Sequence, residues 1–339
     1  MKNNYFTIAL AILCLIFTSC DSDDDFISTD PGVDPANFEL NGVLESDRIL
    51  DPSQPYSLTG SYIVKAGATL TIPAGTQIIS QVASNNYIAI EKGANIDIQG
   101  TQSLPVIMRS SAGNQGDWGG LVLLGDAVTT EGVNATAEVG GFIYGGTNPS
   151  DSSGSINYLI IKNAGAQINA DSQYNGLTLY AVGSGTSIDN VALLDGADDG
   201  VEFFGGSVSI TNLYAENNQD DSVDWTEGWN GTLTNTYIVH NNDGFSTAIE
   251  ADGDNNNPTI TNFTAVSTVG GTALQFKKLS GATMTNVLLM GYDTNVDMKD
   301  QGPIENVIVD NTPMSDPSDD VFNGKAVDIS GWAWVAAGL

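Results

Sequence analysis

Acidic residues recur in the middle of this chain at a spacing that could bring them into one site. Short apolar-polar-apolar segments repeat there, and their middle residues are, in order, Thr178, Glu202, Asp224, Glu250 and Gln275. Side chains alternate between the two faces of a strand, so these middle residues should form one outward column. The first three segments keep steps of 24 and 22 residues, and the fourth follows after 26. Either Glu250 or segment 242–245 is therefore the fourth rung.

Stacked carboxylates about 5 Å apart repel one another, so they should bind a cation or retain a proton. Ca²⁺ takes carboxylate and carbonyl oxygens as ligands, and we expect it as the cofactor. The residues expected to hold it are Asp199, Glu202, Asp221, Asp224 and Asp243. A solvated acidic face without a ligand is the alternative, because runs of surface charge are commonly solvated.

Aromatic and basic residues accompany the acidic column in the sequence. Acids, aromatics and a few cations along a flat parallel sheet would suit a carbohydrate, so a glycan or polysaccharide is the expected partner. The residues expected to contact it are Glu202, Trp225, Trp229, Glu250, Lys277 and Lys278.

A repeat of asparagines indicates how these residues are positioned. Six segments carry an apolar residue two positions before an Asn, namely Asn190, Asn212, Asn235, Asn262, Asn286 and Asn306, at steps of 22, 23, 27, 24 and 20 residues. Such a step is too short for a strand plus a crossover helix, which needs about 30 residues. It suits one coil of a β-solenoid, in which the amides would stack at about 4.8 Å and bond as an internal ladder. Asn157 is expected as an earlier rung.

The first strands carry a family resemblance. The segments LTIPAGTQI, IAIEKGANIDIQG and GDWGGLVLLG, between residues 70 and 125, resemble the first coils of right-handed parallel β-helix proteins of the pectate-lyase-like class. The resemblance implies an all-β, right-handed parallel β-helix, a single-stranded solenoid, with Ca²⁺ on Asp residues and an Arg or Lys base. Gln219-Asp220-Asp221 also resembles the paired-Asp motif of polygalacturonases, which are inverting glycosidases of this fold. The catalytic candidates are therefore Asp220, Asp221 and Asp224.

The basic residues of both enzyme families are missing from the expected places. The coil after the paired Asp lacks the His motif, no Arg follows Arg109, and Lys277 and Lys278 stand among carboxylates that should raise their pKa. We therefore expect a non-catalytic glycan- or cation-binding accessory protein. A polysaccharide lyase or glycoside hydrolase acting on acidic polysaccharide is the first alternative, and a structural spacer or adhesin is the second.

The N-terminal sequence is that of an exported protein. Residues 1–19 read as a signal peptide, and Cys20 with the acidic run after it resembles the acylated Cys of Bacteroidetes surface lipoproteins. This resemblance implies a lipid anchor in the outer membrane, exposure to the cell exterior and an outer-membrane transporter as partner. Residues 20–55 are expected to form an acidic, proline-rich tether and N-terminal cap, and residues 56–339 the β-helix domain.

Composition excludes several functions. The 339 residues carry a net charge of -31 with only 10 Lys and Arg, so nucleic acid is not a partner. With two Cys and one His, a Cys/His zinc site and a Ser-His-Asp triad are close to excluded. Residues 126–154 interrupt the repeat as an excursion with a hairpin near 142–144. Segment 327–335, with two Trp, is expected to cap the open end of the solenoid.

Overall fold

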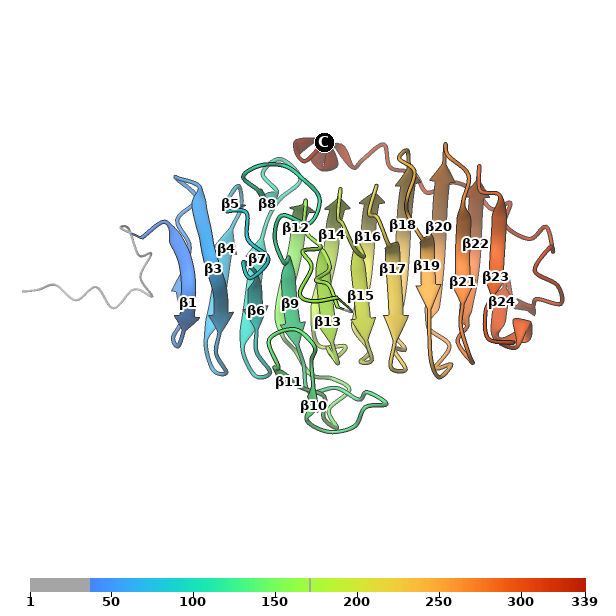
Figure 1. The fold of residues 1–339 in the computed structure, drawn as a ribbon, viewed down its shortest axis with the longest axis horizontal. Helices are drawn as coiled ribbons and strands as arrows, with labels where there is room; N and C mark the ends of the chain where they lie inside the picture. The colour runs from blue at the N-terminus through green and yellow to red at the C-terminus, as the bar shows by residue number, and fades with distance from the viewer. Residues whose placement is uncertain (1–36, 171) are drawn as a thin grey trace, which may run out of the picture. The chain divides into compact units, whose positions relative to one another are not determined.

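The structure, a computed structural model, describes residues 37–170 and 172–339, and strands and turns account for nearly all of them. Most strands pair in parallel with the equivalent strand one coil later, about two dozen residues on. The chain therefore winds as a parallel β-helix with three strand positions in each coil, and these positions stack into three sheets that we call A, B and C (Figure 1). The predicted all-β solenoid is confirmed.

In the part of the chain that the structure describes, sheets A and B share six long strands that bend at their middle. These strands are β12 (Gly154–Lys162), β14 (Ser187–Leu194), β16 (Ser209–Glu216), β18 (Thr232–His240), β20 (Thr259–Ser267) and β22 (Ala282–Met290). Sheet A also contains β2 (Arg48–Ile49), β4 (Thr69–Pro73), β7 (Asn95–Gln99) and β24 (Val307–Val309). Sheet B also contains β5 (Gln77–Ser80) and β8 (Val106–Ser110).

Sheet C carries the acidic repeat. Its strands are β6 (Ile88–Ile90), β9 (Leu121–Leu124), β13 (Leu177–Tyr180), β15 (Val201–Phe204), β17 (Asp221–Thr226), β19 (Thr247–Ala251), β21 (Thr272–Phe276) and β23 (Thr294–Met298). Two earlier strands, β1 (Glu39–Leu44) and β3 (Tyr56–Val64), pass from sheet B into sheet C. The first coil thus begins inside the segment predicted as tether and cap. The predicted signal peptide and Cys20 lie outside the described residues.

An asparagine occupies the bend between sheets A and B in five successive coils. Asn190, Asn212, Asn235, Asn262 and Asn286 have φ between 55° and 60°, a left-handed conformation that Asn adopts more readily than most residues. Each side-chain nitrogen donates to the side-chain oxygen of an Asn one coil earlier, over 2.8 to 3.0 Å. Asn therefore suits the bend because it tolerates the left-handed backbone conformation. The hydrogen bonds between stacked Asn side chains satisfy amides that are partly buried.

The two ends of this ladder differ from the prediction. Asn157 accepts the hydrogen bond of Asn190, but Tyr158 occupies the positive-φ position of that coil. Asn306 is not a rung, because it lies in the short 3₁₀ helix η1 (Ile304–Asn306) and donates to the carbonyl of Leu279 over 2.8 Å. The spacing of Asn residues indicates the repeat. It does not distinguish an Asn at a bend, such as Asn286, from an Asn in the turn before a strand, such as Asn306.

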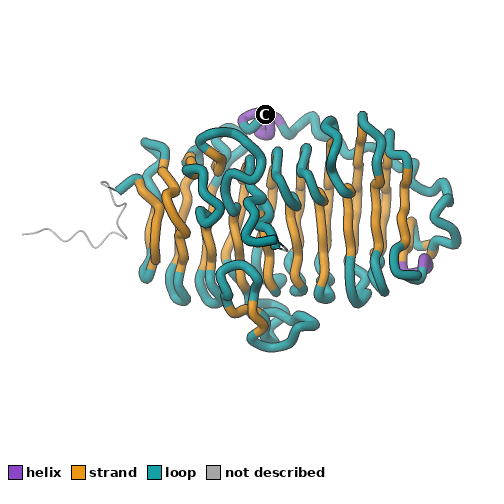
Figure 2. The backbone as a smooth tube through the Cα atoms, in the orientation of Figure 1, coloured by secondary structure: helices purple, strands orange, loops and turns teal. Residues whose placement is uncertain are grey.

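The predicted excursion at residues 126–154 covers part of the outer face of sheet C. It contains an antiparallel hairpin of β10 (Ala135–Thr136) and β11 (Ile143–Tyr144), as predicted (Figures 1 and 2). Tyr144 packs at a tilt against Tyr180 of the sheet, with 4.8 Å between ring centroids, and Tyr180 stacks on Phe204 at 4.3 Å. Tyr144 also donates its hydroxyl hydrogen to Glu227. The excursion is therefore packed against the sheet next to the acidic residues.

The C-terminal segment does not cap the end of the β-helix, so that prediction is wrong. Trp334 and Val335, in the 3₁₀ helix η2 (Ala333–Ala337), pack against outward apolar residues of sheet B such as Ile160 and Leu194. Covering these apolar residues removes their surface from water, which stabilises the fold. In the last coil, buried residues of the loop after β24, which includes β25 (Thr312–Pro313), join the core instead, namely Met314 and Phe322. Within the described part of the chain, no helix is long and apolar enough to cross a membrane.

Candidate functional site

The outward column on sheet C forms as predicted. The parallel register pairs Thr178 with Glu202, Glu202 with Asp224, Asp224 with Glu250 and Glu250 with Gln275. Glu250 is therefore the fourth rung, and segment 242–245 is a loop before β19. The column continues to Asp297 on β23.

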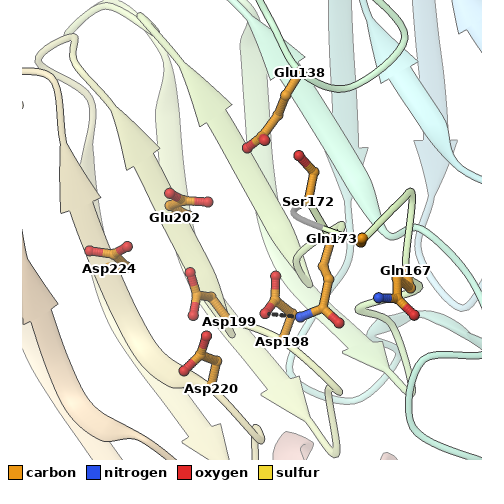
Figure 3. A pocket seen from close by; sticks show the side chains of 10 residues that line it. Glu138, Gln167, Ser172, Gln173, Asp198, Asp199, Glu202, Asp220 and Asp224 are labelled. Carbon is orange, nitrogen blue, oxygen red and sulfur yellow. Dashed lines mark hydrogen bonds between the residues drawn. The ribbon is translucent and has the colours of Figure 1, made fainter.

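A polar groove of about 370 Å³ lies over the first part of this column. Carboxylates of Asp198, Asp199, Glu202, Asp220 and Asp224 line it on the side of the β-helix (Figure 3). Glu138 reaches it from the excursion, and Gln167, Ser172 and Gln173 reach it from the loop before β13. The groove is thus built by two coils and two loops, and almost everything that lines it is an oxygen-bearing side chain.

The carboxylates form two groups of three that share Asp199. Oxygen atoms of Asp199, Glu202 and Asp224 all lie within 4.8 Å of one another, as do oxygen atoms of Asp198, Asp199 and Asp220. Asp199 is buried, whereas Glu202 and Asp224 are partly buried and Asp220 is exposed. A divalent cation needs oxygen ligands that converge in this way.

The pKa values of these carboxyl groups are raised, first of all by burial. Burial and the charges of Asp224 and Glu202 raise the pKa of Asp199 well above its ordinary value. Burial raises the pKa of Glu202 and of Asp224 well above the ordinary value in the same way. The pKa of Asp198 rises to about 7, through burial and the charge of Asp220, against a 2.6 Å hydrogen bond donated by Gln173. Burial and mutual repulsion thus favour protonated carboxyl groups in the absence of a cation, and a bound cation would compete with these protons.

One buried oxygen of the first group has no hydrogen-bond partner in the described part of the chain. It is Oδ1 of Asp224. A buried acceptor without a partner costs free energy on the order of 1–3 kcal/mol. Together with the converging oxygens of Asp199 and Glu202, this atom shows that the residues present fit a cation such as Ca²⁺.

A second polar column lies at the entry into the strands of sheet C, and the member of it that the sequence reasoning missed is Asn175. Asn175, Asp199 and Asp221 each stand two residues before the first apolar residue of a repeat, and all three are buried. The backbone N–H of Asp221 donates to Asp199 over 2.9 Å, and the Thr247 hydroxyl donates to Asp221 over 2.5 Å. The common offset was visible in the sequence. The contributions of Glu138 and Gln173 were not, because they come from non-repeating loops.

Comparison with known proteins identifies the family of the chain. Residues 42–323 match the family described as pectate-lyase like beta helix domain. The chain belongs to this family. The right-handed parallel β-helix expected from the resemblance is thus confirmed. No curated protein and no solved structure matches the chain.

Two aromatic residues expected to contact a glycan are not accessible in this pectate-lyase-like domain. Trp225 alternates inward next to Asp224, and Trp229 is fully buried. Trp229 stacks on Phe203 at 4.2 Å between centroids, and its indole N–H donates to the Val208 carbonyl over 2.9 Å. The prediction that they line the binding surface is wrong. Trp225 follows Asp224 on β17, so its side chain points to the opposite face of the strand, and Trp229 is buried in the loop after β17.

Of the other residues expected to contact a glycan, Glu202 lines the groove, and Glu250, Lys277 and Lys278 form ion pairs at the far part of the column. Lys277 is paired with Glu250, and Lys278 Nζ lies 3.1 Å from Asp252. Burial alone would lower the pKa of Lys277, but its hydrogen bond to Glu250 and the nearby carboxylate charges raise it above the ordinary value. Lys277 is therefore protonated at neutral pH and unsuited to act as a base, as the sequence indicated.

Asp220 and Asp221, which resemble the paired-Asp motif, do not face a common site in the structure. Asp220 is exposed and lines the groove, whereas Asp221 is buried and bonded to Thr247. Asp224, three residues after Asp221 on β17, also lines the groove. Among the predicted cation ligands, Asp221 and the exposed Asp243 belong to neither carboxylate group found among residues 37–170 and 172–339.

His240, the one histidine, has a packing role. Its ring is buried, stacks on Phe245 at 3.7 Å between centroids, and lies within hydrogen-bond distance of the hydroxyls of Ser222 (3.0 Å) and Tyr292 (2.9 Å). Burial lowers the pKa of His240 to about 4, so the ring is neutral at physiological pH. It does not line the acidic groove.

Proposed function

We propose that this pectate-lyase-like domain is a non-catalytic binding protein whose acidic groove takes a divalent cation, Ca²⁺ first of all, and a glycan beside it. The observation that carries the proposal is the convergence of Asp199, Glu202 and Asp224 on one point, with the buried Oδ1 of Asp224 lacking a partner. Bound Ca²⁺ would offset two of the three negative charges of the ionised group and offer open coordination positions to sugar oxygens.

The groove favours binding over the two enzyme alternatives. A lyase needs a neutral base near the substrate, and Lys277 is held protonated in its pair with Glu250. An inverting hydrolase needs two carboxyl groups about 6.5–9.5 Å apart with water between them. The oxygens within each group of three lie inside 4.8 Å, which suits a shared cation better.

A hydrolase remains the second candidate because of Asp198. Its carboxyl group lines the groove and has a pKa raised to about 7 by burial and by Asp220, in the range of a general acid. The cellular setting of either function comes from the N-terminal sequence. We propose a Cys20 lipid anchor, display on the outer membrane and delivery of the glycan to an outer-membrane transporter.

Calorimetric titration of Ca²⁺ into EDTA-treated protein tests the proposal. We expect saturable binding that Asp224→Asn weakens by about tenfold or more, because it removes a charged ligand. The matched change Asp243→Asn should leave the affinity unchanged, since Asp243 lies in neither carboxylate group. Absence of Ca²⁺ binding, or equal effects of the two substitutions, would refute the cation site.

A glycan panel separates binding from catalysis. Neutral and uronic-acid polymers should raise the melting temperature in Ca²⁺ and not in EDTA, without releasing reducing ends or unsaturated products. Release of reducing ends without unsaturated products, abolished by Asp198→Asn, would instead establish the hydrolase, and unsaturated products would establish the lyase. If neither Ca²⁺ nor any glycan shifts the melting temperature, a spacer or adhesin role replaces both.

A further inference from the structure

Two buried oxygen atoms without a hydrogen-bond partner among the described residues flank Glu202 on neighbouring coils. One is Oδ1 of Asp224, on the coil after Glu202, and the other is Oδ1 of Asn175, on the coil before it. Asn175 is 2% exposed, so its oxygen has no access to bulk solvent. Leaving a buried acceptor unpaired is unfavourable, and two beside one carboxylate indicate a missing ligand.

Hydrogen bonds donated by its side-chain nitrogen fix the orientation of the Asn175 amide beside Glu202. Its nitrogen donates to Glu202 Oε2 over 2.7 Å and to the Thr178 hydroxyl over 3.4 Å. Nitrogen and oxygen of an amide are bonded to the same carbon, so the bond to Glu202 also keeps Oδ1 close to that carboxylate. By register Asn175 occupies the same position as Asp199 one coil later.

We propose that Oδ1 of Asn175 is a neutral ligand of the cation held by Asp199, Glu202 and Asp224. The inference rests on the proposed function and adds a residue from an earlier coil to its site. An amide oxygen combined with carboxylates is a ligand set typical of Ca²⁺. The two atoms of the amide then have separate roles, since the nitrogen orients Glu202 and the oxygen binds the cation.

Two substitutions at this position distinguish a ligand from a positioning residue. Asn175→Ala removes both the oxygen and the N–H donor, whereas Asn175→Asp keeps an oxygen and removes the donor to Glu202. We expect Asn175→Ala to weaken Ca²⁺ binding by about tenfold or more, and Asn175→Asp to stay within about threefold of the original affinity.

Luminescence of bound Tb³⁺ gives a readout that a structural role would not change. Lifetimes measured in H₂O and D₂O report the number of coordinated waters. A lost protein ligand is replaced by water, so Asn175→Ala should add about one water and Asn175→Asp should add none. Asn86→Ala is the matched control, because Asn86 is also buried (1% exposed) but donates to the carbonyls of Leu58 and Gln81 instead of a carboxylate.

The outcomes separate the inference from the function on which it rests. If Asn175→Ala and Asn175→Asp weaken binding equally, Asn175 only positions Glu202 and the ligand role is overturned. An unchanged affinity and hydration in Asn175→Ala overturns it too. If the unsubstituted protein binds neither Ca²⁺ nor Tb³⁺, the proposed function itself fails. Circular dichroism of each variant confirms that the β-helix is folded in these comparisons.

Discussion

Replacing Asp221 by Asn should stabilise the cation-free protein at high pH and hardly affect it at low pH. The Asp221 carboxyl group is 3% exposed, and burial, with the charges of Asp220 and Glu250, raises its pKa from 3.8 to about 8. The folded state therefore holds a proton that the unfolded chain has released. The stability contributed by this group is complete below pH 3.8 and is lost as the pH rises to about 8.

The size of the effect follows from this difference in pKa. Between the two values, unfolding releases one proton, so stability falls by about 1.4 kcal/mol for each pH unit. Between pH 5 and pH 8 the original protein should lose up to about 4 kcal/mol relative to Asp221→Asn. The amide can accept the Thr247 hydroxyl hydrogen as the carboxylate does, which keeps the local hydrogen bond.

Urea unfolding in EDTA at pH 5, 6, 7 and 8, followed by tryptophan fluorescence, measures this difference. Asp117→Asn is the control. Asp117 is also buried, but its carboxylate accepts hydrogen bonds from the Ser110 hydroxyl and the Asn114 N–H. Such bonds are stronger to a carboxylate than to a neutral amide, so Asp117→Asn should not stabilise the protein at high pH. A constant difference between Asp221→Asn and the original protein across the pH series would refute the electrostatic reasoning.

Substitutions at three further positions test the described fold. Trp229→Ala should lower the stability measured by urea unfolding by about 3–5 kcal/mol, because the indole lies in the core. The Ca²⁺ affinity of the folded protein should stay unchanged. Lost binding without lost stability would instead show that Trp229 contacts the ligand. Asn235→Ala should destabilise the protein by about 1 kcal/mol more than Asn235→Gly, since both lose the ladder bonds but only Gly adopts a φ of 57° freely. Trp334→Ala should lower the melting temperature and promote association in size-exclusion chromatography by uncovering sheet B, and a monomer of unchanged stability would contradict the described packing.

The repeating parts of the molecule could be predicted from sequence because each coil imposes the same requirement. A left-handed bend in every coil selects Asn, and alternation along sheet C separates Glu202 and Asp224 from the inward Val201 and Val223. These patterns predicted the solenoid and the acidic column. The same alternation, applied one residue further, would have placed Trp225 in the core.

The non-repeating parts could not be predicted in this way. Glu138 and Gln173 reach the groove from loops whose path no period describes. Segment 327–335 returns along sheet B because Ile160 and Leu194 leave an apolar face there, a fact that depends on which residues of distant strands point outward. The chemistry of the site thus depends on a column that the sequence shows and on loops that only the structure places.

The most direct test of the central claim is a crystal of the protein soaked in Tb³⁺ and measured for anomalous scattering. We predict a peak within about 2.3–2.6 Å of carboxylate oxygens from Asp199, Glu202 and Asp224. An anomalous map with no peak among these three side chains, at Tb³⁺ concentrations that saturate the protein in solution, would contradict it.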